Sequence, residues 1–430
     1  MSKVRTDDIF NFTETSDACV KCGKCIPVCT IHNVNADEVT SPRGFIDLLG
    51  AYQKGRLDLD KNAKDIFESC FLCTNCVDVC PKSLPTDMVI EQVRADIADK
   101  FGIAWFKKAF FYLLRHRKVM DIMFKLGYVF QTCGFKVQNE ISSMKPRFRM
   151  PIIKKDRLLP AMTKTSFLNA HPKELIDHGG ERRVAIFIGC LANYNYTGIG
   201  EGLLTILKHL EIDAFLAKSQ KCCGAPAYFT GDFDTVDHLA KKNIEYFEQF
   251  IDEVEAIIIP ESTCSAMIRI DYEHFFHDQP EWKERALKLK PKIFMATEWL
   301  QHNSHLQNLL ASKGRQDALV TYHDPCHARK MQGVYKEPRS LVSQTYEIKE
   351  MSDPNQCCGF GGVTMQTEKF HFARAAGKPK AAMIKQTGAT VVAAECSACR
   401  MQLNDAMDDA QVDTVFKNPI ELIAEALESK

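Results

Sequence analysis

In the first hundred residues, apolar positions recur at helical spacing around two short runs of cysteine. SPRGFIDLLGAYQKG predicts a helix entered through Ser41 and Pro42, because serine caps helices and proline suits their first turn. KNAKDIFESC predicts a second helix that leads into the second cysteine run. PTDMVIEQVRADIADKFG predicts a third, with three apolar residues on one face: Val89, Val93 and Ile97. We therefore expect residues 1–99 to form an α-helical domain.

Residues 100–157 are strongly basic, with 14 lysines and arginines against three acids. FGIAWFKKAFFYLLRHRKVMDIMFKLGYVF mixes aromatic residues, leucines and cations at helical spacing. It fits a helix that lies on an anionic membrane surface or grips an acidic partner, or a connecting helix that packs on its own domain. We favour the connecting helix, in which the lone Cys133 would be a small buried hydrophobe. MKPRFRMPIIKKDRLLP predicts an extended linker, so residues 100–182 form a basic helical segment and linker.

From Arg183 onward, short apolar runs alternate with longer amphipathic ones, which indicates α/β units around a mainly parallel sheet. The pattern occurs twice. VAIFIGC, KCCGAPA and EAIIIPESTCSAM are matched by VTYHDPC, QCCGFGG and ATVVAAECSAC at similar intervals. An internal duplication explains this match, with repeats at residues 183–310 and 311–430. The predicted fold class is thus α+β multidomain, with a helical N-terminal domain and a duplicated α/β C-terminal domain.

Composition excludes several classes of function. Lysine plus arginine equals aspartate plus glutamate at 55 each, so the chain as a whole has no field that would gather nucleic acid. The N-terminus shows no secretory signal and no apolar run is long enough to span a bilayer, so we expect a cytoplasmic protein, with peripheral attachment to the inner face of the membrane as the alternative. Eighteen cysteines in such a chain indicate metal-binding thiolates rather than disulfides.

The two N-terminal cysteine runs, CVKCGKCIPVC and CFLCTNCVDVCP, share a spacing of two, two and three residues and begin 51 residues apart. In proteins with two [4Fe-4S] cubes, each run gives three thiolates to one cube and the fourth to the other. The predicted ligands of the first cube are Cys19, Cys22, Cys25 and Cys80, and those of the second are Cys70, Cys73, Cys76 and Cys29. Thr30 stands where proline usually follows the fourth cysteine. A pair of zinc sites is the alternative interpretation, although four cysteines at this spacing suit a [4Fe-4S] cube better than a zinc site.

The cysteine doublets of the two repeats follow strands, at the sheet edge where open α/β folds bind ligands. Adjacent cysteines need a turn to point the same way, and the glycines after them, Gly224 and Gly359, permit it. The second repeat offers five thiolates, from Cys326, Cys357, Cys358, Cys396 and Cys399. The first repeat offers four, from Cys190, Cys222, Cys223 and Cys264, because Met267 replaces a fifth. Four thiolates suit a [4Fe-4S] cluster or zinc equally.

Two ferredoxin runs, two cysteine-doublet repeats and SPRGFIDLL between the runs make the chain resemble the iron-sulfur subunit of glycolate oxidase. Iron-sulfur subunits of D-lactate and anaerobic glycerol-3-phosphate dehydrogenases are similar in layout. The repeats also resemble the cysteine-rich subunit of heterodisulfide reductase, which implies a noncubane [4Fe-4S] cluster on the five cysteines of the second repeat. The resemblance implies a flavin-containing dehydrogenase subunit as partner, which oxidises a 2-hydroxy acid, and a quinone acceptor at the membrane.

The leading hypothesis is an electron-transfer subunit of an oxidoreductase, with catalytic residues unknown. One alternative is a catalyst that reduces a disulfide or quinone at the second repeat, as the heterodisulfide enzyme does; others are the glycerol-3-phosphate enzyme's subunit and a zinc-stabilised scaffold. GIGEG at residues 198–202 departs from a dinucleotide fingerprint, so we expect a closely packed helix start there. His323 and His327 flank Cys326 and are left out of the ligand set.

Overall fold

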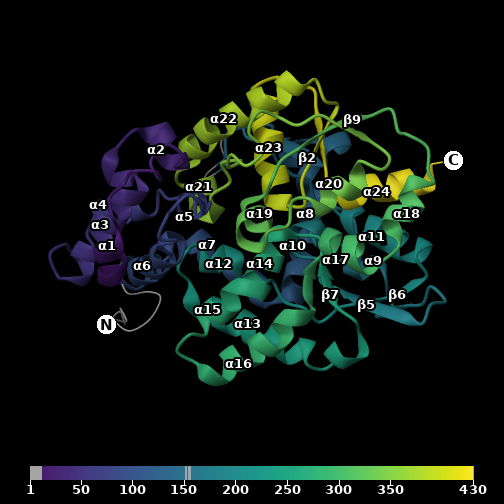
Figure 1. Ribbon diagram of the computed structural model, residues 1–430, viewed down its shortest axis with the longest axis horizontal. Helices are drawn as coiled ribbons and strands as arrows, with labels where there is room; N and C mark the ends of the chain where they lie inside the picture. Colours follow the sequence, from purple (N-terminus) through teal and green to yellow (C-terminus); the bar gives the residue numbers. More distant parts are fainter. Residues whose placement is uncertain (1–11, 151–152, 154–155, 430) are drawn as a thin grey trace. The chain divides into compact units, whose positions relative to one another are not determined.

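The computed structural model describes residues 12–150, 153 and 156–429 (Figure 1). The chain forms two compact units, each built from segments far apart in the sequence. The first unit comprises Met1–Tyr112, Gly224–Asp237 and Gln356–Lys380. The second unit comprises Leu113–Cys223, His238–Asn355 and Ala381–Lys430. The mixed helix and sheet fold predicted from the sequence is confirmed, and the predicted domain boundaries stay a prediction.

Helices make up the regular structure of the first unit, and none of its described residues lies in a strand. Ser41 caps the third helix as predicted, since its side chain accepts a hydrogen bond from the Gly44 N–H at 3.0 Å. The N-terminal helices, grouped in Figure 1, are α1 (Phe12–Ala18), α2 (Thr30–Asn35), α3 (Pro42–Gln53), α4 (Lys61–Phe67), α5 (Asn75–Asp78) and α6 (Thr86–Phe101). The later segments add α12 (Ala225–Tyr228), α21 (Gly362–Thr367), and parts of α13 (Phe233–Phe247) and α22 (Phe370–Thr387).

The core of the first unit combines its early and late segments. Val89, Val93 and Ile97 of α6 are buried, as their spacing predicts. They belong to one apolar cluster with residues from the other N-terminal helices and with Met365 and Phe370 from the third segment. Each such side chain contributes about 1.5 to 3 kcal/mol when fully buried, so the third segment is an integral part of this core.

Two helices and a small antiparallel sheet follow α6. They are α7 (Trp105–Arg115), α8 (Arg117–Gly134), β1 (Phe135–Gln138), the 3-10 turn Asn139–Ile141, β2 (Ser143–Pro146) and β3 (Leu159–Pro160). Part of the predicted linker lies outside the described residues, at 151–152 and 154–155. The predicted burial of Cys133 is wrong: its side chain is exposed, because it lies on the face of α8 opposite the buried Met120 and Gln131.

Besides the small antiparallel sheet, the second unit contains two larger open sheets, in agreement with the predicted duplication. The five-stranded sheet has the order β4-β6-β5-β7-β8, in which only the edge strand β4 is antiparallel. Its strands are β4 (Leu175–Ile176), β5 (Arg182–Ile186), β6 (Ile212–Leu216), β7 (Ile257–Ile259) and β8 (Ile293–Met295). The four-stranded sheet is parallel throughout, with the order β10-β9-β11-β12: β10 (Glu347–Ile348), β9 (Leu319–Tyr322), β11 (Val391–Ala393) and β12 (Val415–Lys417).

Helices connect and cover these strands, and one extended apolar core joins the two sheets. They include α9 (Phe167–Ala170), α10 (Cys190–Tyr194), α11 (Gly198–His209), α14 (Ser262–Ala266), α15 (Tyr272–Phe275), α16 (Pro280–Leu289), α17 (Ala296–Asn303), α18 (Leu306–Ala311), α19 (Cys326–Gln332), α20 (Glu337–Val342), α23 (Ser397–Asp409) and α24 (Pro419–Glu428). A π-helix, Met267–Asp271, joins α14 to α15.

The GIGEG segment begins α11 and packs closely, as expected. A Cβ atom at Gly200 would lie 2.5 Å from the ring of the buried Phe167. A Cβ atom at Gly202 would lie 3.1 Å from the Ile420 carbonyl oxygen of α24. The glycines therefore serve helix packing.

The Gly200→Ala variant is expected to lower the free energy of unfolding by about 1 to 3 kcal/mol, because the added methyl group displaces a buried ring and overpacks the core. This loss exceeds the gain of about 0.5 to 1 kcal/mol that alanine brings to a helix interior. Circular dichroism during denaturation measures the change. Lys208→Ala, an exposed change on the same helix, is the control and should leave the midpoint within experimental error. A Gly200→Ala midpoint at or above that of the parent protein would contradict this packing argument.

Candidate metal centres

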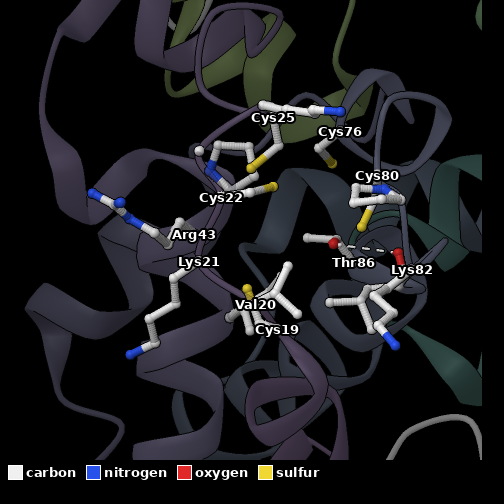
Figure 2. A pocket seen from close by; sticks show the side chains of 16 residues that line it. Cys19, Val20, Lys21, Cys22, Cys25, Arg43, Cys76, Cys80, Lys82 and Thr86 are labelled. Carbon is white, nitrogen blue, oxygen red and sulfur yellow. Dashed lines mark hydrogen bonds between the residues drawn. The ribbon is translucent and has the colours of Figure 1, made fainter.

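Cysteines from both N-terminal runs surround a first hollow in the first unit, with about 440 Å³ of space not filled by atoms. Figure 2 shows the sulfur atoms around a common space, with Lys21 and Arg43 directed away from it. The cysteines that line this hollow are Cys19, Cys22, Cys25, Cys76 and Cys80. The four predicted ligands of the first cube are therefore brought together.

A second hollow of about 380 Å³ lies in the same unit. Its cysteines are Cys29, Cys70, Cys73 and Cys76, the predicted ligands of the second cube. Pro42, Cys76 and Thr86 line both hollows, so the two sites share a wall. Cys80 of the second run thus lines the first hollow and Cys29 of the first run lines the second, as the crossed pairing requires, while Cys76 lines both; the assignment of ligands to each cube stays a prediction.

Left-handed backbone bends the cysteine runs around these hollows. Lys21, Leu72 and Thr74 have φ of 53°, 51° and 57°, conformations that non-glycine residues seldom adopt. The turn at Leu72 brings its N–H to 3.4 Å from the Cys70 Sγ, a donor aimed at a ligand sulfur. Strained backbone of this kind is retained where the surrounding structure fixes it, commonly at functional sites.

Thr30 makes a contact that the sequence motif does not reveal. Its side-chain oxygen lies 3.4 Å from the Cys73 Sγ, and both groups are buried. Where proline usually follows the fourth cysteine, this chain therefore places a hydroxyl against a sulfur of the second hollow. Hydrogen bonds to cluster sulfurs are one way in which a protein tunes reduction potential.

Burial controls the protonation of these thiols. It raises the pKa of Cys29 and of Cys70 to about 12, and that of Cys25 above its usual value. Without a cation, these buried thiols hold their protons. A coordinated metal reverses this preference because it deprotonates its thiol ligands, so metal loading releases protons. Convergent thiols with few competing oxygen ligands fit an iron-sulfur cluster.

Arg94 is a buried cation beside the second hollow that sequence reasoning missed. Its guanidinium donates to the carbonyl oxygens of Phe67 at 3.1 Å, Cys70 at 2.7 Å and Phe229 at 2.8 Å. Gly231 allows this approach: its φ is +87°, and a Cβ there would lie 2.3 Å from the Arg94 carbonyl oxygen. Burial lowers the pKa of Arg94, but an arginine keeps its charge in proteins. One fixed positive charge therefore stands behind the Cys70 loop.

The four cysteines of the first repeat gather in the second unit. The Sγ atoms of Cys223 and Cys264 are 3.3 Å apart. A hydrogen bond with Cys222, together with burial, raises the pKa of Cys190 and of Cys223 well above the usual range. The hydrogen bond with Cys223 lowers the pKa of Cys264, but burial and neighbouring negative charge outweigh it and the net shift is upward. The site therefore matches a four-thiolate centre.

Side chains from neighbouring helices fix this first-repeat site. Tyr272 donates its hydroxyl to the Cys223 carbonyl at 2.9 Å, and Asn243 donates to the Cys222 carbonyl at 3.0 Å. A hollow beside Cys190 and Cys222 is also lined by Arg117 and Met120 of α8. Gly224, after the doublet, has φ of +97°, which confirms the predicted permissive turn.

The five cysteines of the second repeat are divided between the units. Cys357 and Cys358 belong to the first unit, where the Gly359 N–H lies 3.4 Å from the Cys357 Sγ and Gly359 has φ of +90°, as predicted. The others, Cys326, Cys396 and Cys399, belong to the second unit.

Within the second unit, Cys326 starts α19, and its Sγ lies 3.3 Å from the Nδ1 of His327. Cys396 caps α23, where its Sγ accepts from the Cys399 N–H at 3.3 Å. The hydrogen bond from the Cys399 thiol lowers the pKa of Cys396 to about 6. Cys396 is thus set up as a thiolate. His323, which directly follows β9, is buried.

Two buried carboxyl groups, those of Glu261 and Glu395, brace the loop before α23. Glu261 accepts hydrogen bonds from the Ser397 N–H at 2.7 Å and from the Ser397 hydroxyl. Glu395 accepts from the Thr297 hydroxyl at 2.5 Å. Burial raises the pKa of each carboxyl to about 8. The two repeats are therefore joined through their cysteine loops, because Glu261 precedes Cys264 and Glu395 precedes Cys396.

Comparison with known proteins matches these sites to two domain families. A 4Fe-4S dicluster domain matches residues 15–84, and a cysteine-rich domain matches residues 184–269 and again residues 320–404. The matched ranges contain all the cysteines predicted as ligands. Iron-sulfur clusters are therefore the cofactors of this chain.

Relatives with known names share this layout. The probable glycolate oxidase iron-sulfur subunit of Bacillus subtilis strain 168 is 29% identical over 90% of this chain and 87% of its own length. A subunit of the fumarate reductase (CoM/CoB) of Methanothermobacter marburgensis is 25% identical over 98% of this chain and 74% of its own length. Lactate utilization protein A of an Exiguobacterium species is 30% identical over 51% of this chain and 88% of its own length. The chain is accordingly a homologue of the glycolate oxidase iron-sulfur subunit, with one 4Fe-4S dicluster domain and two cysteine-rich domains.

Proposed function

We propose that this chain carries electrons from a flavin-containing subunit, which oxidises a 2-hydroxy acid such as glycolate or lactate, toward quinone. The observation that carries the proposal is the shared wall of the two hollows in the first unit. When bound there, [4Fe-4S] clusters supply one-electron transfer. Neighbouring sites in one helical unit suit a relay, since both are held by the same helices.

The proposed ligands follow the lining of the hollows. Cys19, Cys22, Cys25 and Cys80 hold one cubane cluster, and Cys29, Cys70, Cys73 and Cys76 hold the other. The chain's own residues set the environment: the Thr30 hydroxyl and the Leu72 N–H face sulfurs, and Arg94 supplies a fixed charge. These are the means by which a protein adjusts the potential of a cofactor.

The cysteine-rich repeats would complete the relay. The sequence pattern of the second repeat supports a noncubane [4Fe-4S] cluster on its five cysteines. The first repeat, with four convergent thiols, suits a [4Fe-4S] cluster or a zinc ion, since Met267 occupies the fifth position and is buried. The names of the glycolate and lactate relatives support a multi-subunit dehydrogenase as the setting.

A second candidate is a catalyst that reduces a disulfide or quinone at the second repeat. The likeness over 98% of the chain to the subunit of the fumarate reductase (CoM/CoB) supports it. The low pKa of Cys396 also suits a site that handles sulfur chemistry. Turnover of such a substrate by the purified chain, with no flavin subunit present, would favour this candidate over the relay.

The relay predicts a specific effect of Cys73→Ser. The variant should lose iron and sulfide equivalent to about one [4Fe-4S] cluster, because a buried ligand of the second site is removed. Substrate-to-quinone electron flow in the assembled complex should cease, while the separately assayed flavin subunit still reduces a soluble dye. Metal analysis, low-temperature EPR and the two activity assays measure these effects.

Cys133→Ser is the matched control, because Cys133 is exposed and lines none of the three hollows described above. Its iron content and electron flow should equal those of the parent protein. Loss of dye reduction with Cys73→Ser would contradict the proposed division of labour. A chain that binds zinc with little iron would contradict the relay itself.

Arg94 gives a second prediction. Replacing it with methionine removes a buried positive charge beside the second site, which disfavours the more negative reduced state. The midpoint potential of one cluster should therefore fall by about 50 to 100 mV, equivalent to roughly 1 to 2 kcal/mol. Arg94→Lys keeps the positive charge but loses the guanidinium whose N–H groups reach three carbonyl oxygens. It should therefore leave the midpoint potential unchanged and lower the free energy of unfolding. Redox titration followed by EPR separates the two effects; equal potentials in all three proteins would exclude an electrostatic role.

A further inference from the structure

The helix α8 exposes an apolar stripe along its length. Five residues at helical spacing are about half exposed or more: Ile122 (61%), Met123 (50%), Leu126 (49%), Val129 (59%) and Phe130 (63%). We call this stripe, with the lysines beside it, the outer face of α8. Scattered apolar residues are common on protein surfaces, but a contiguous stripe on one helix marks an interaction site.

The opposite face of α8 packs against the rest of the second unit, to which the helix itself belongs. Asp121 accepts a hydrogen bond from the Tyr194 hydroxyl at 2.5 Å, and Phe124 stacks on Tyr194 with the ring centroids 4.4 Å apart. Gln131 exchanges two hydrogen bonds with the backbone of Met162, at 3.0 and 3.1 Å. These contacts hold the rotation of the helix. The outer face therefore cannot turn inward to bury its apolar side chains.

Positive charge lies beside the stripe. Residues 117–149 contain seven lysines and arginines against two acids, in a chain whose overall charge is zero. Two of these cations are engaged elsewhere, since Arg117 lies on the inner side of α8 and Lys145 pairs with Asp408 at 2.6 Å. Lys118 and Lys125 are exposed on α8 itself. At its C-terminal end, Arg147 donates to the carbonyl oxygens of Thr132 and Phe135, at 3.0 and 3.1 Å. The next residue, Phe148, is 55% exposed.

Of the two acids, Asp121 is engaged by Tyr194 on the inner side of α8. Apolar residues flanked by cations, with the nearest carboxylate turned inward, are the composition of a helix that lies in the interface of an anionic bilayer. A second copy of the chain would bring its own cations against this face, and like charges repel. None of the described helices is both long enough and apolar enough to cross a membrane.

We infer that the outer face of α8 is a docking surface for a bilayer of anionic phospholipid, on which the chain sits peripherally. The inference concerns lipid binding and does not rest on the proposed relay. It also gives α8 a place in that relay. Arg117 and Met120, on the inner side of the helix, line the hollow at Cys190 and Cys222, so one helix diameter of about 10 Å separates that site from the lipid.

Vesicle co-sedimentation of the anaerobically purified full chain tests the inference. The probes are vesicles of phosphatidylglycerol with phosphatidylethanolamine, and vesicles of phosphatidylcholine alone. The parent protein should bind the anionic vesicles and not the neutral ones. Ile122→Ser/Leu126→Ser/Phe130→Ser should weaken that binding at least about 10-fold, because it removes apolar area from the interface.

Lys118→Gln/Lys125→Gln should weaken binding by about 10- to 30-fold at low salt and by less at high salt, where charges are screened. Leu175→Ser/Leu287→Ser is the matched control, since both leucines are exposed but lie on β4 and α16. Its binding should equal that of the parent protein. Iron content and circular dichroism establish that every variant is folded and loaded.

Three results would overturn the inference. One is a parent protein that stays in the supernatant with anionic vesicles. Another is a triple serine variant that sediments as well as the leucine control. The third is a parent protein that is dimeric by light scattering, becomes monomeric in the triple variant, and fails to bind vesicles, which would assign the face to a second copy of the chain. None of these results would bear on the proposed cluster ligands, which the Cys73→Ser variant tests separately.

Discussion

Several thiolates placed within a few ångströms of one another in a protein interior repel, and burial adds a further cost to each charge. The structure answers this constraint by fixing the backbone that carries the sulfurs. Helices α3 and α6 wall the two hollows, left-handed residues bend the cysteine runs inward, and a guanidinium secures the Cys70 loop from behind. The raised pKa values of the Cys29 and Cys70 thiols have the same cause: burial disfavours the thiolate, and metal binding favours it by displacing the proton.

The two cysteine-rich repeats show one framework that carries different chemistry. In each, a buried parallel strand leads into a short helix whose first turns present cysteine, and a glycine with positive φ follows a doublet. The first repeat gathers four thiols and buries Met267 where its counterpart presents Cys399. The thioether of Met267 fills the space of a ligand but brings no charge. The two repeats therefore keep similar packing but differ in the number of thiolates that they offer.

Local pattern predicted much of this architecture. The spacing of the cysteine runs predicted that both runs line each hollow, the Ser41 cap predicted the start of α3, and alternating runs predicted parallel sheets. Sequence could not reveal the contacts of Arg94, because its carbonyl partners come from segments 24 to 135 positions away. It also misjudged Cys133, since an apolar stripe on a helix looks the same whether it faces the core or the outside. The helical period records which residues share a face, and only tertiary packing decides where that face points.

The first unit completes its core with a segment that is made late. Met365 and Phe370 pack in the same cluster as Phe45 and Val93, so this core stays open until translation has passed the third segment. The apolar side chains of the early helices that this segment covers therefore remain exposed through most of synthesis. A chain cut short before this segment would expose the apolar faces of α3 and α6. Completion of the apolar core of the first unit is thereby coupled to completion of the polypeptide.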